Sequence, residues 1–142
     1  AVLENLPGAD ALVMAAAGAD FRPEGVAEQK IKKGDDSLVL TLIHATDILL
    51  AVSRHKDRPK AVIGFAAESQ DLIANAEKKL KAKHLDMIAA NDISAADAGF
   101  AVDTNRVVLL FPDGSQDSLP LMDKAEIADA ILAKVVELLP RE

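Results

Sequence analysis

The stretch Asp86-Met87-Ile88-Ala89-Ala90-Asn91-Asp92, together with the two segments before it, decides the fold. Residues 85–90 form a short apolar run of the kind found in buried strands. Residues 69–84 carry apolar side chains at helical spacing, with Ser69 placed as the N-cap. Residues 61–67 (AVIGFAA) read as a second buried strand that closes in small residues. A strand, a helix and a strand in this order predict a right-handed crossover and a parallel sheet.

The rest of the chain continues this alternation and then departs from it. Residues 11–17 (ALVMAAA) predict a strand buried on both faces. A hairpin-like excursion is expected over residues 30–43, with a strand at 37–43, and a helix is expected to begin at Thr46-Asp47. Beyond Asn91-Asp92 we expect two strands joined at Asn105, a turn, a further strand and a final helix, over residues 100–104, 106–111, 112–114, 118–121 and 125–139 respectively.

These elements predict an α/β fold and a single domain over residues 1–142. The expected architecture is a Rossmann-like, three-layer arrangement with a parallel sheet, helices on both faces and a C-terminal β-hairpin extension. The chain is long enough to bury a core of its own. We find no internal repeat and no linker, so one unit is expected.

The composition excludes several classes of protein. Half of the residues are hydrophobic, but only 3% are aromatic and neither Trp nor Tyr occurs, so Ala, Val, Ile and Leu must build the core. With no Cys, a disulfide framework, a thiolate metal site and a Cys nucleophile are excluded. The formal charge of −7 argues against nucleic acid as a partner. No apolar run approaches the roughly 20 residues that cross a bilayer, so we expect a cytoplasmic protein without a membrane partner.

The candidate ligand site lies where the predicted strands end. Open α/β sheets bind ligands in the crevice beyond the carboxyl ends of their strands. Three such ends carry small or polar residues, at residues 17–20, 67–69 and 90–92. We therefore expect a ligand crevice at this edge of the sheet.

Two basic clusters stand out in this acidic chain and suggest a polyanionic ligand. One is formed by Lys30-Ile31-Lys32-Lys33, and the other by four lysines within residues 78–83. Lys79 and Lys83 are four residues apart, so a helix places them on one face. The alternative is that lysines near a helix end complement the helix dipole and improve solubility. The first cluster could likewise protect the edge of a sheet.

Three further positions each have two interpretations. Asp20 could accept a hydrogen bond from a base or ribose, or it could pair with Arg22. Phe65 could stack on a base or simply pack in the core. Thr46-Asp47 could bind an anion at a helix N-terminus or only cap that helix. The three histidines have no metal-ligand spacing and no carboxylate partner in sequence, so we predict no metal site on the protein. Walker and dinucleotide fingerprints are absent.

Four segments, read together, resemble the signatures of one family. They are AAAGADFRP at residues 15–23, KIKK at 30–33, IGFAAES at 63–69 and ANDIS at 90–94. They resemble the family's A-A-A-V-A-D-[FYW]-R-P, K-I-K-K, G-F-A-A-E-[TS] and A-N-D-[IV]-S motifs. The family is phosphopantothenoylcysteine synthetase, usually the C-terminal half of the bifunctional decarboxylase/synthetase of coenzyme A biosynthesis. The resemblance runs over essentially the whole chain.

The resemblance implies a CTP-dependent ligase. In such an enzyme the carboxylate of 4′-phosphopantothenate is activated as an acyl-cytidylate with release of pyrophosphate, and the amine of cysteine then attacks it. The same resemblance implies Mg²⁺ held mainly by phosphates, a homodimer, and FMN only in a decarboxylase half that this chain lacks. It assigns Lys30 to catalysis. It assigns nucleotide binding to Ala16, Asp20, Lys30, Asp47, Ile48, Leu49, Phe65, Lys79 and Lys83.

The sequence departs from the family at three places. Gly18 replaces the usual Val, and Ala45-Thr46 replaces the usual Pro-containing pair before Asp47. The family's N-terminal half has no counterpart, so the chain is expected to be the C-terminal portion of a synthetase that by itself binds CTP weakly. Two alternatives stay open: an assembly or dimerisation module, and a different nucleotide-binding α/β domain.

Overall fold

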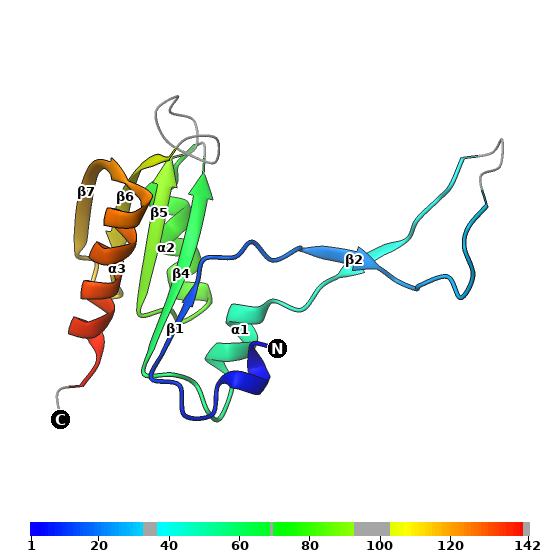
Figure 1. Ribbon diagram of the computed structural model, residues 1–142, viewed down its shortest axis with the longest axis horizontal. Coiled ribbons are helices and arrows are strands. Elements are labelled where there is room, and N and C mark those ends of the chain that lie inside the picture. The colour runs from blue at the N-terminus through cyan, green and yellow to red at the C-terminus, as the bar shows by residue number, and fades with distance from the viewer. Residues whose placement is uncertain (33–36, 69, 93–102, 141–142) are drawn as a thin grey trace.

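The computed structural model describes residues 1–32, 37–68, 70–92 and 103–140 (Figure 1). Helices and strands alternate in the first part of the chain, and a hairpin and a long helix close it. In chain order they are the 3₁₀ turn η1 (Leu3–Asn5), β1 (Ala11–Met14), β2 (Phe21–Pro23), β3 (Leu42–His44), α1 (Ile48–Ser53), β4 (Ala61–Glu68), α2 (Leu72–Ala82), β5 (Met87–Asp92), β6 (Thr104–Leu110), β7 (Gln116–Asp123) and α3 (Lys124–Leu138).

The main sheet has five strands in the order β1-β4-β5-β6-β7. β1, β4 and β5 are parallel to one another, whereas β6 runs antiparallel to β5 and β7 antiparallel to β6. The α/β, Rossmann-like prediction is confirmed. The predicted hairpin is the β6–β7 pair, and it continues the same sheet.

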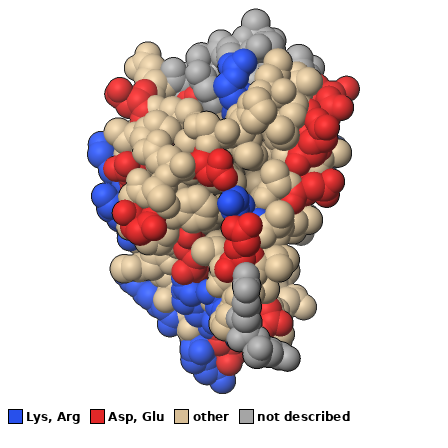
Figure 2. Space-filling model, turned by 90° about the vertical axis from the view of Figure 1, so that its left-hand side faces the viewer, with Lys and Arg blue, Asp and Glu red and all other residues tan. Residues whose placement is uncertain are grey.

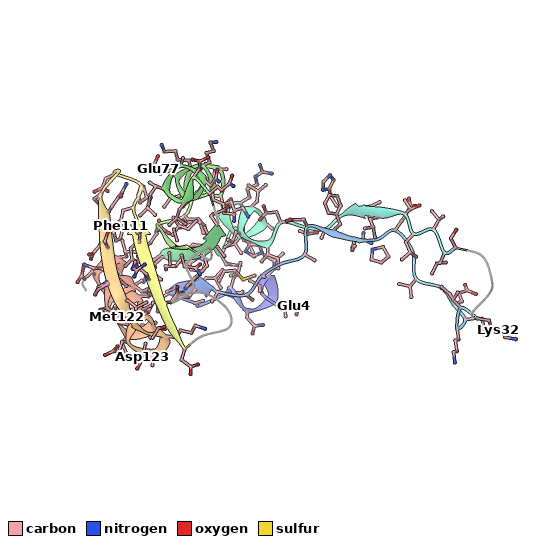
Figure 3. The ribbon with its side chains drawn as sticks, turned by 90° about the horizontal axis from the view of Figure 1, so that it is seen from above. Glu4, Lys32, Glu77, Phe111, Met122 and Asp123 are labelled. Carbon is pink, nitrogen blue, oxygen red and sulfur yellow. The ribbon has the colours of Figure 1, made fainter. Side chains whose placement is uncertain are left out.

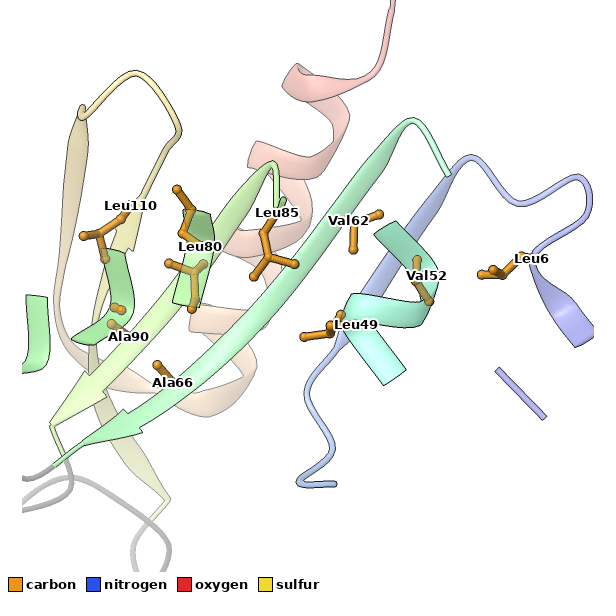
Figure 4. Close-up of a cluster of buried hydrophobic side chains, with 11 residues drawn as sticks. Leu6, Leu49, Val52, Val62, Ala66, Leu80, Leu85, Ala90 and Leu110 are labelled. Atoms are coloured by element: carbon orange, nitrogen blue, oxygen red, sulfur yellow. The ribbon is translucent and has the colours of Figure 1, made fainter. Parts of the chain in front are cut away.

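Helices cover both faces of this sheet, because successive side chains of a strand point to opposite sides. On one face, Val62 and Ala66 of β4 pack with Leu49 and Val52 of α1 and with Leu80 of α2 (Figure 4). On the other face, Ala61 and Ile63 of the same strand belong to the cluster that α3 covers. The three α3 side chains in that cluster, Ile127, Ile131 and Val135, are spaced four residues apart.

The two longest helices begin differently. Asp123 and Glu126 form a capping box at the start of α3, with the Asp123 N–H donating to Glu126 Oε2 at 3.0 Å. The N-cap of α2 is Asp71, which has a left-handed backbone (φ 49°) and no side-chain cap hydrogen bond. Ser69, the predicted N-cap, lies outside the described residues.

A two-stranded ribbon projects from the body of the molecule (Figures 1 and 3). β2 and β3 pair antiparallel, with Arg22 opposite Ile43. The ribbon comprises both strands and the described segments between them, residues 24–32 and 37–41. The strand predicted over residues 37–43 is therefore wrong in extent: only Leu42–His44 is a strand, because its partner β2 offers just three residues for pairing. The ribbon exposes several large apolar side chains, among them Val26 (94%) and Val39 (85%).

Other predicted boundaries need correction. The strand over residues 11–17 ends at Met14 and lies at an edge of the described sheet, where it is half-buried instead of buried on both faces. The third parallel strand is Met87–Asp92, slightly later than predicted. The two strands predicted to meet at Asn105 are one strand, Thr104–Leu110, whose register shifts between Asn105 and Val107. Residues 100–102 of the first of them lie outside the described part of the chain.

Candidate functional site

The site begins as a notch in the sheet. β1 stops at Met14, which pairs with Gly64, while β4 continues to Glu68. The last residues of β4 are therefore paired with β5 on one side, whereas no strand of the described residues pairs with them on the β1 side. This notch lies at the carboxyl ends of the parallel strands, where open α/β sheets bind ligands.

A cleft of about 890 Å³ occupies the notch, within the size range of small-molecule sites. Its walls come from both loops that lead to and from the ribbon, from the strand ends, and from the helices on both faces of the sheet. The lining residues are 14–21, 44–49, Phe65, Ala67, Lys79, Lys83, Asn91, Asn105 and Lys124.

The first wall is the small-residue segment after β1, which includes the predicted Ala16. Side chains this small let a ligand approach the backbone closely. A Cβ added at Gly18 would meet no atom within 4 Å, so nothing steric in this wall requires a glycine there. The wall is tied to the next one because the Asp20 carbonyl accepts a hydrogen bond from the Ala45 N–H at 2.8 Å.

The second wall is the start of α1, where Asp47, Ile48 and Leu49 all line the cleft. Asp47 is the N-cap, and its carboxylate accepts the Leu50 N–H at 3.0 Å. The same side chain pairs with the Lys83 ammonium at 3.1 Å. Partial burial by itself would raise the pKa of Asp47, but the Leu50 hydrogen bond and the Lys83 charge outweigh it, and the pKa lies below its ordinary value. Asp47 is therefore a capping residue and a counter-ion together.

Helix α2 contributes the predicted pair of lysines. Lys79 and Lys83 both line the cleft, as their four-residue spacing predicts, whereas Lys78 and Lys81 do not. Each of the two has a carboxylate partner: Lys79 lies 3.6 Å from Glu68, and Lys83 pairs with Asp47. The basic cluster thus divides between cleft and outer surface.

The cleft reaches both faces of the sheet. Leu49 belongs to the core beneath α1 and α2, whereas Phe65 packs against the core beneath α3. At the outer rim, the rings of Phe21 and His44 lie with centroids 4.7 Å apart and join the cleft to the base of the ribbon. A bound ligand can therefore contact groups from either side of the sheet.

Lys30 is the one predicted residue that the single chain does not bring to the cleft. It is exposed and does not line the cavity. Figure 3 shows its neighbour Lys32 at the far end of the ribbon, away from the sheet. The remaining predicted residues, far apart in sequence, converge on one cavity.

Asn91 lies in one of the three strand ends predicted to border the crevice, although no role was assigned to it; three polar residues of the lining, His44, Asn105 and Lys124, were not predicted. Asn91 is the penultimate residue of β5 and lies within a motif quoted above, which is a signal that could have assigned it a role. Asn105 and Lys124 follow from the hairpin topology, because β6 begins and β7 ends at the same edge as the end of β5. Neither position carries a local signal.

Two other classes of site find no support in the described residues. Within residues 1–32, 37–68, 70–92 and 103–140, no group of three or more His, Cys, Asp and Glu could hold a metal ion. No helix in those ranges is long and apolar enough to cross a membrane. Figure 2 shows acidic side chains spread among neutral ones on the face that α3 and β7 present, with basic side chains along one edge and at its lower end.

Comparison with known proteins points to one family. The family model for the DNA/pantothenate metabolism flavoprotein C-terminal domain matches residues 1–139. The coenzyme A biosynthesis bifunctional protein CoaBC of Bacillus subtilis is 42% identical over 138 residues, which is 97% of this chain and 34% of that protein. The protein of the same name from Vibrio cholerae is 40% identical over 139 residues, covering 96% and 35% respectively. The chain spans about a third of the length of these relatives.

Solved structures agree on the fold. A crystal structure of the C-terminal domain of coenzyme A biosynthesis bifunctional protein CoaBC superposes with a TM-score of 0.73 at 33% identity, covering 94% of this chain and 57% of that one. The DNA/pantothenate metabolism flavoprotein from Streptococcus pneumoniae gives a TM-score of 0.73 at 21% identity, covering 95% and 66%. The second likeness speaks for the fold alone.

Proposed function

The chain belongs to the DNA/pantothenate metabolism flavoprotein C-terminal domain family, and we propose that it supplies the CTP-binding part of a ligase that joins cysteine to 4′-phosphopantothenate in coenzyme A biosynthesis. The cleft is the observation that carries the proposal. Apart from Lys30, every residue predicted to hold the nucleotide lines it. The chain spans 34% of the Bacillus subtilis relative, so the complete activity is proposed for the whole enzyme.

Each wall of the cleft suits one part of a nucleoside triphosphate. The small residues after β1 let the ribose lie close to the backbone, and Asp20 offers a carboxylate to its hydroxyls or to the base. Phe65 offers a ring on which a base can stack. Lys79 and Lys83 lie where phosphates can take over the places of their carboxylate partners, Glu68 and Asp47.

The proposed reaction has two steps. A carboxylate oxygen of 4′-phosphopantothenate attacks the α-phosphorus of CTP, the bond to the β-phosphate oxygen breaks, and pyrophosphate leaves. The cysteine amine then attacks the acyl carbon, loses a proton, and CMP leaves with the electron pair of the broken C–O bond. Ammonium groups already in place beside the phosphates stabilise the charge that develops there, which is usually the largest catalytic contribution.

Magnesium fits this site as a companion of the nucleotide. Among the residues that the structure describes, the carboxylates in the lining are Asp20 and Asp47, and the second is already engaged with the α1 backbone and with Lys83. Mg²⁺ prefers phosphate oxygens and waters with few protein ligands. The ion would therefore be held mainly by phosphates, and it would supply charge neutralisation.

A homodimer would complete the site. Lys30 stands on a ribbon that exposes apolar side chains such as Val26 and Val39, and an isolated ribbon of this kind has little to hold it in place. Burying these side chains against a second copy would order the ribbon and bring Lys30 to a phosphate in the partner's cleft. The alternative function, an assembly module without catalysis, rests on the same exposed ribbon.

A thermal-shift titration of this chain with CTP, ATP and UTP, each with Mg²⁺, tests the function. Saturation at 100 times Kd stabilises the folded state by roughly 2.7 kcal/mol. We expect CTP alone to raise the melting temperature. A response to all three nucleotides would favour a different nucleotide-binding domain, and no response to any of them would favour the assembly module.

A matched pair of variants makes the titration specific to the cleft. Lys83→Gln is expected to abolish most of the CTP shift, whereas Lys78→Gln, on the same helix but outside the cleft, is expected to keep it. Lys30→Gln should remove the CTP response while the unliganded chain melts as before. A Lys30→Gln chain that responds to CTP as the parent does would refute the assignment of that residue.

A further inference from the structure

Asn91, Asn105 and Lys124 form a second polar group in the cleft, on the side of the sheet that α3 covers. β5 side chains at odd positions, such as Met87 and Ala89, point into the core beneath α3, and Asn91 follows in that alternation. Asn91 lies opposite Val107, and Asn105 lies opposite Met122, two residues before Lys124. The Lys124 N–H donates to the Asp103 carbonyl at 3.0 Å, which holds the start of α3 against the start of β6.

No carboxylate of the described residues forms an ion pair with Lys124, the charged member of this group. Of the lysines that the structure describes, three line the cleft, and two of these, Lys79 and Lys83, have carboxylate partners at 3.6 and 3.1 Å. Among the described residues, Lys124 has no ion pair and the Asn91 amide has no hydrogen bond. The Asn105 Oδ1 accepts the Arg106 N–H at 2.9 Å, which leaves its NH₂ group free to donate to a ligand. Within the described part of the chain, the group therefore presents one cation without a carboxylate partner and two amides.

We propose that Lys124, with Asn91 and Asn105, binds the phosphomonoester end of the acid substrate. The inference rests on the proposed function. That substrate carries a carboxylate, which must lie beside the α-phosphate of the nucleotide, and a phosphate at its far end. The lysines of α2 serve the nucleotide on one face of the sheet, so the distant phosphate needs a separate cation. Lys124 supplies it from the other face, and the amides donate to the remaining phosphate oxygens.

The test pairs a change in the protein with a change in the ligand. Isothermal titration of the chain with 4′-phosphopantothenate and with pantothenate, each in the presence of CTP, measures the contribution of the phosphate. Lys124→Gln is expected to lower the affinity for 4′-phosphopantothenate by about 10- to 100-fold, the usual effect of removing a charge-assisted hydrogen bond. Its affinity for pantothenate and for CTP should stay unchanged. Lys124→Arg should restore most of the loss, and Lys78→Gln should show none.

The outcomes separate this inference from the proposed function. If Lys124→Gln lowers the affinity for 4′-phosphopantothenate and for pantothenate equally, Lys124 has a structural role. If the variant lowers the affinity for CTP, Lys124 lies at the triphosphate. Either result overturns the inference. If the parent chain binds CTP but prefers 4′-phosphopantothenate no more than pantothenate, the inference fails while the proposed function stands. If no CTP response is seen at all, the proposed function itself fails and this inference fails with it.

Discussion

The start of β5 is held by an ion pair whose removal should cost far more than its length alone suggests. The Asp86 Oδ2 atom accepts hydrogen bonds from the Val62 N–H and from Arg58 Nη2, both at 2.7 Å. Arg58 Nη2 also donates to the His84 carbonyl at 2.9 Å. The Asp86 carboxylate therefore links the starts of the neighbouring parallel strands β4 and β5 to Arg58 in the loop before β4. Asp86→Ala removes that link.

The expected magnitude follows from what the truncation leaves behind. It leaves the Val62 N–H and the Arg58 guanidinium without their acceptor, and a hydrogen bond to a charged group contributes about 1.5–3 kcal/mol. The side chains of Asp86 and Arg58 are 31% and 26% exposed, so hydrogen bonds to water recover part of this loss. We expect the free energy of unfolding to fall by about 2–3 kcal/mol. At roughly 4 °C per kcal/mol for a chain of this size, the melting temperature should fall by about 8–12 °C.

The chain contains a matched control. Lys60 and Asp10 form an ion pair of 2.8 Å, but these side chains are 60% and 64% exposed. An exposed pair contributes about 0–1 kcal/mol, so Asp10→Ala should be close to neutral. Urea unfolding followed by circular dichroism measures both variants against the parent chain. If both variants lose the same stability, burial does not set the strength of these pairs and the reasoning is refuted.

Two further predictions concern the walls of the cleft and the core beneath it. Gly64→Ala should destabilise the chain by about 1–3 kcal/mol in chemical denaturation, because the new Cβ would lie 2.7 Å from Leu85 Cδ1 and 3.4 Å from Leu49 Cδ1; an unchanged midpoint would mean that Leu85 moves aside freely. Asp47→Asn should cost roughly 0.5 kcal/mol at pH 7, since the amide keeps the cap but loses the ion pair with Lys83. Because the pKa of Asp47 is lowered in the folded chain, the stability that this carboxylate contributes is fully present above pH 3.8 and is lost as the pH falls below that value. The two proteins should therefore converge in acid, and a gap independent of pH in thermal melts would contradict this.

Local pattern was enough to predict the elements that the core depends on. The apolar run at residues 61–67 became β4, and the helical stripes became α2 and α3. These predictions succeed because the burial of a side chain on one helix face or strand face follows from spacing within the element itself. Lys79 and Lys83 lie on the same side of α2, facing the cleft, because they are four residues apart.

The limits of strands were less predictable. β1 was expected to include Ala15 to Ala17, but an alanine run carries no signal for where its partner stops pairing. Asn105 is predicted to join two strands, as an interruption between residues 100–104 and 106–111. The sheet instead accommodates the interruption as a register shift within β6. Pairing with a distant strand outweighs local composition in both places.

The sequence by itself determined the α/β class, the family and most of the residues that line the cleft, because these follow from short apolar patterns and from motifs of a few residues. Only the tertiary structure decided that β1 ends four residues before β4 and so opens the notch. Only the tertiary structure showed that the antiparallel hairpin brings Asn105 and Lys124 to the edge of the sheet where β5 ends, next to Asn91, while Lys30 stands apart on the ribbon. These facts depend on which strands pair and where their pairing stops, and such contacts join residues far apart in the chain.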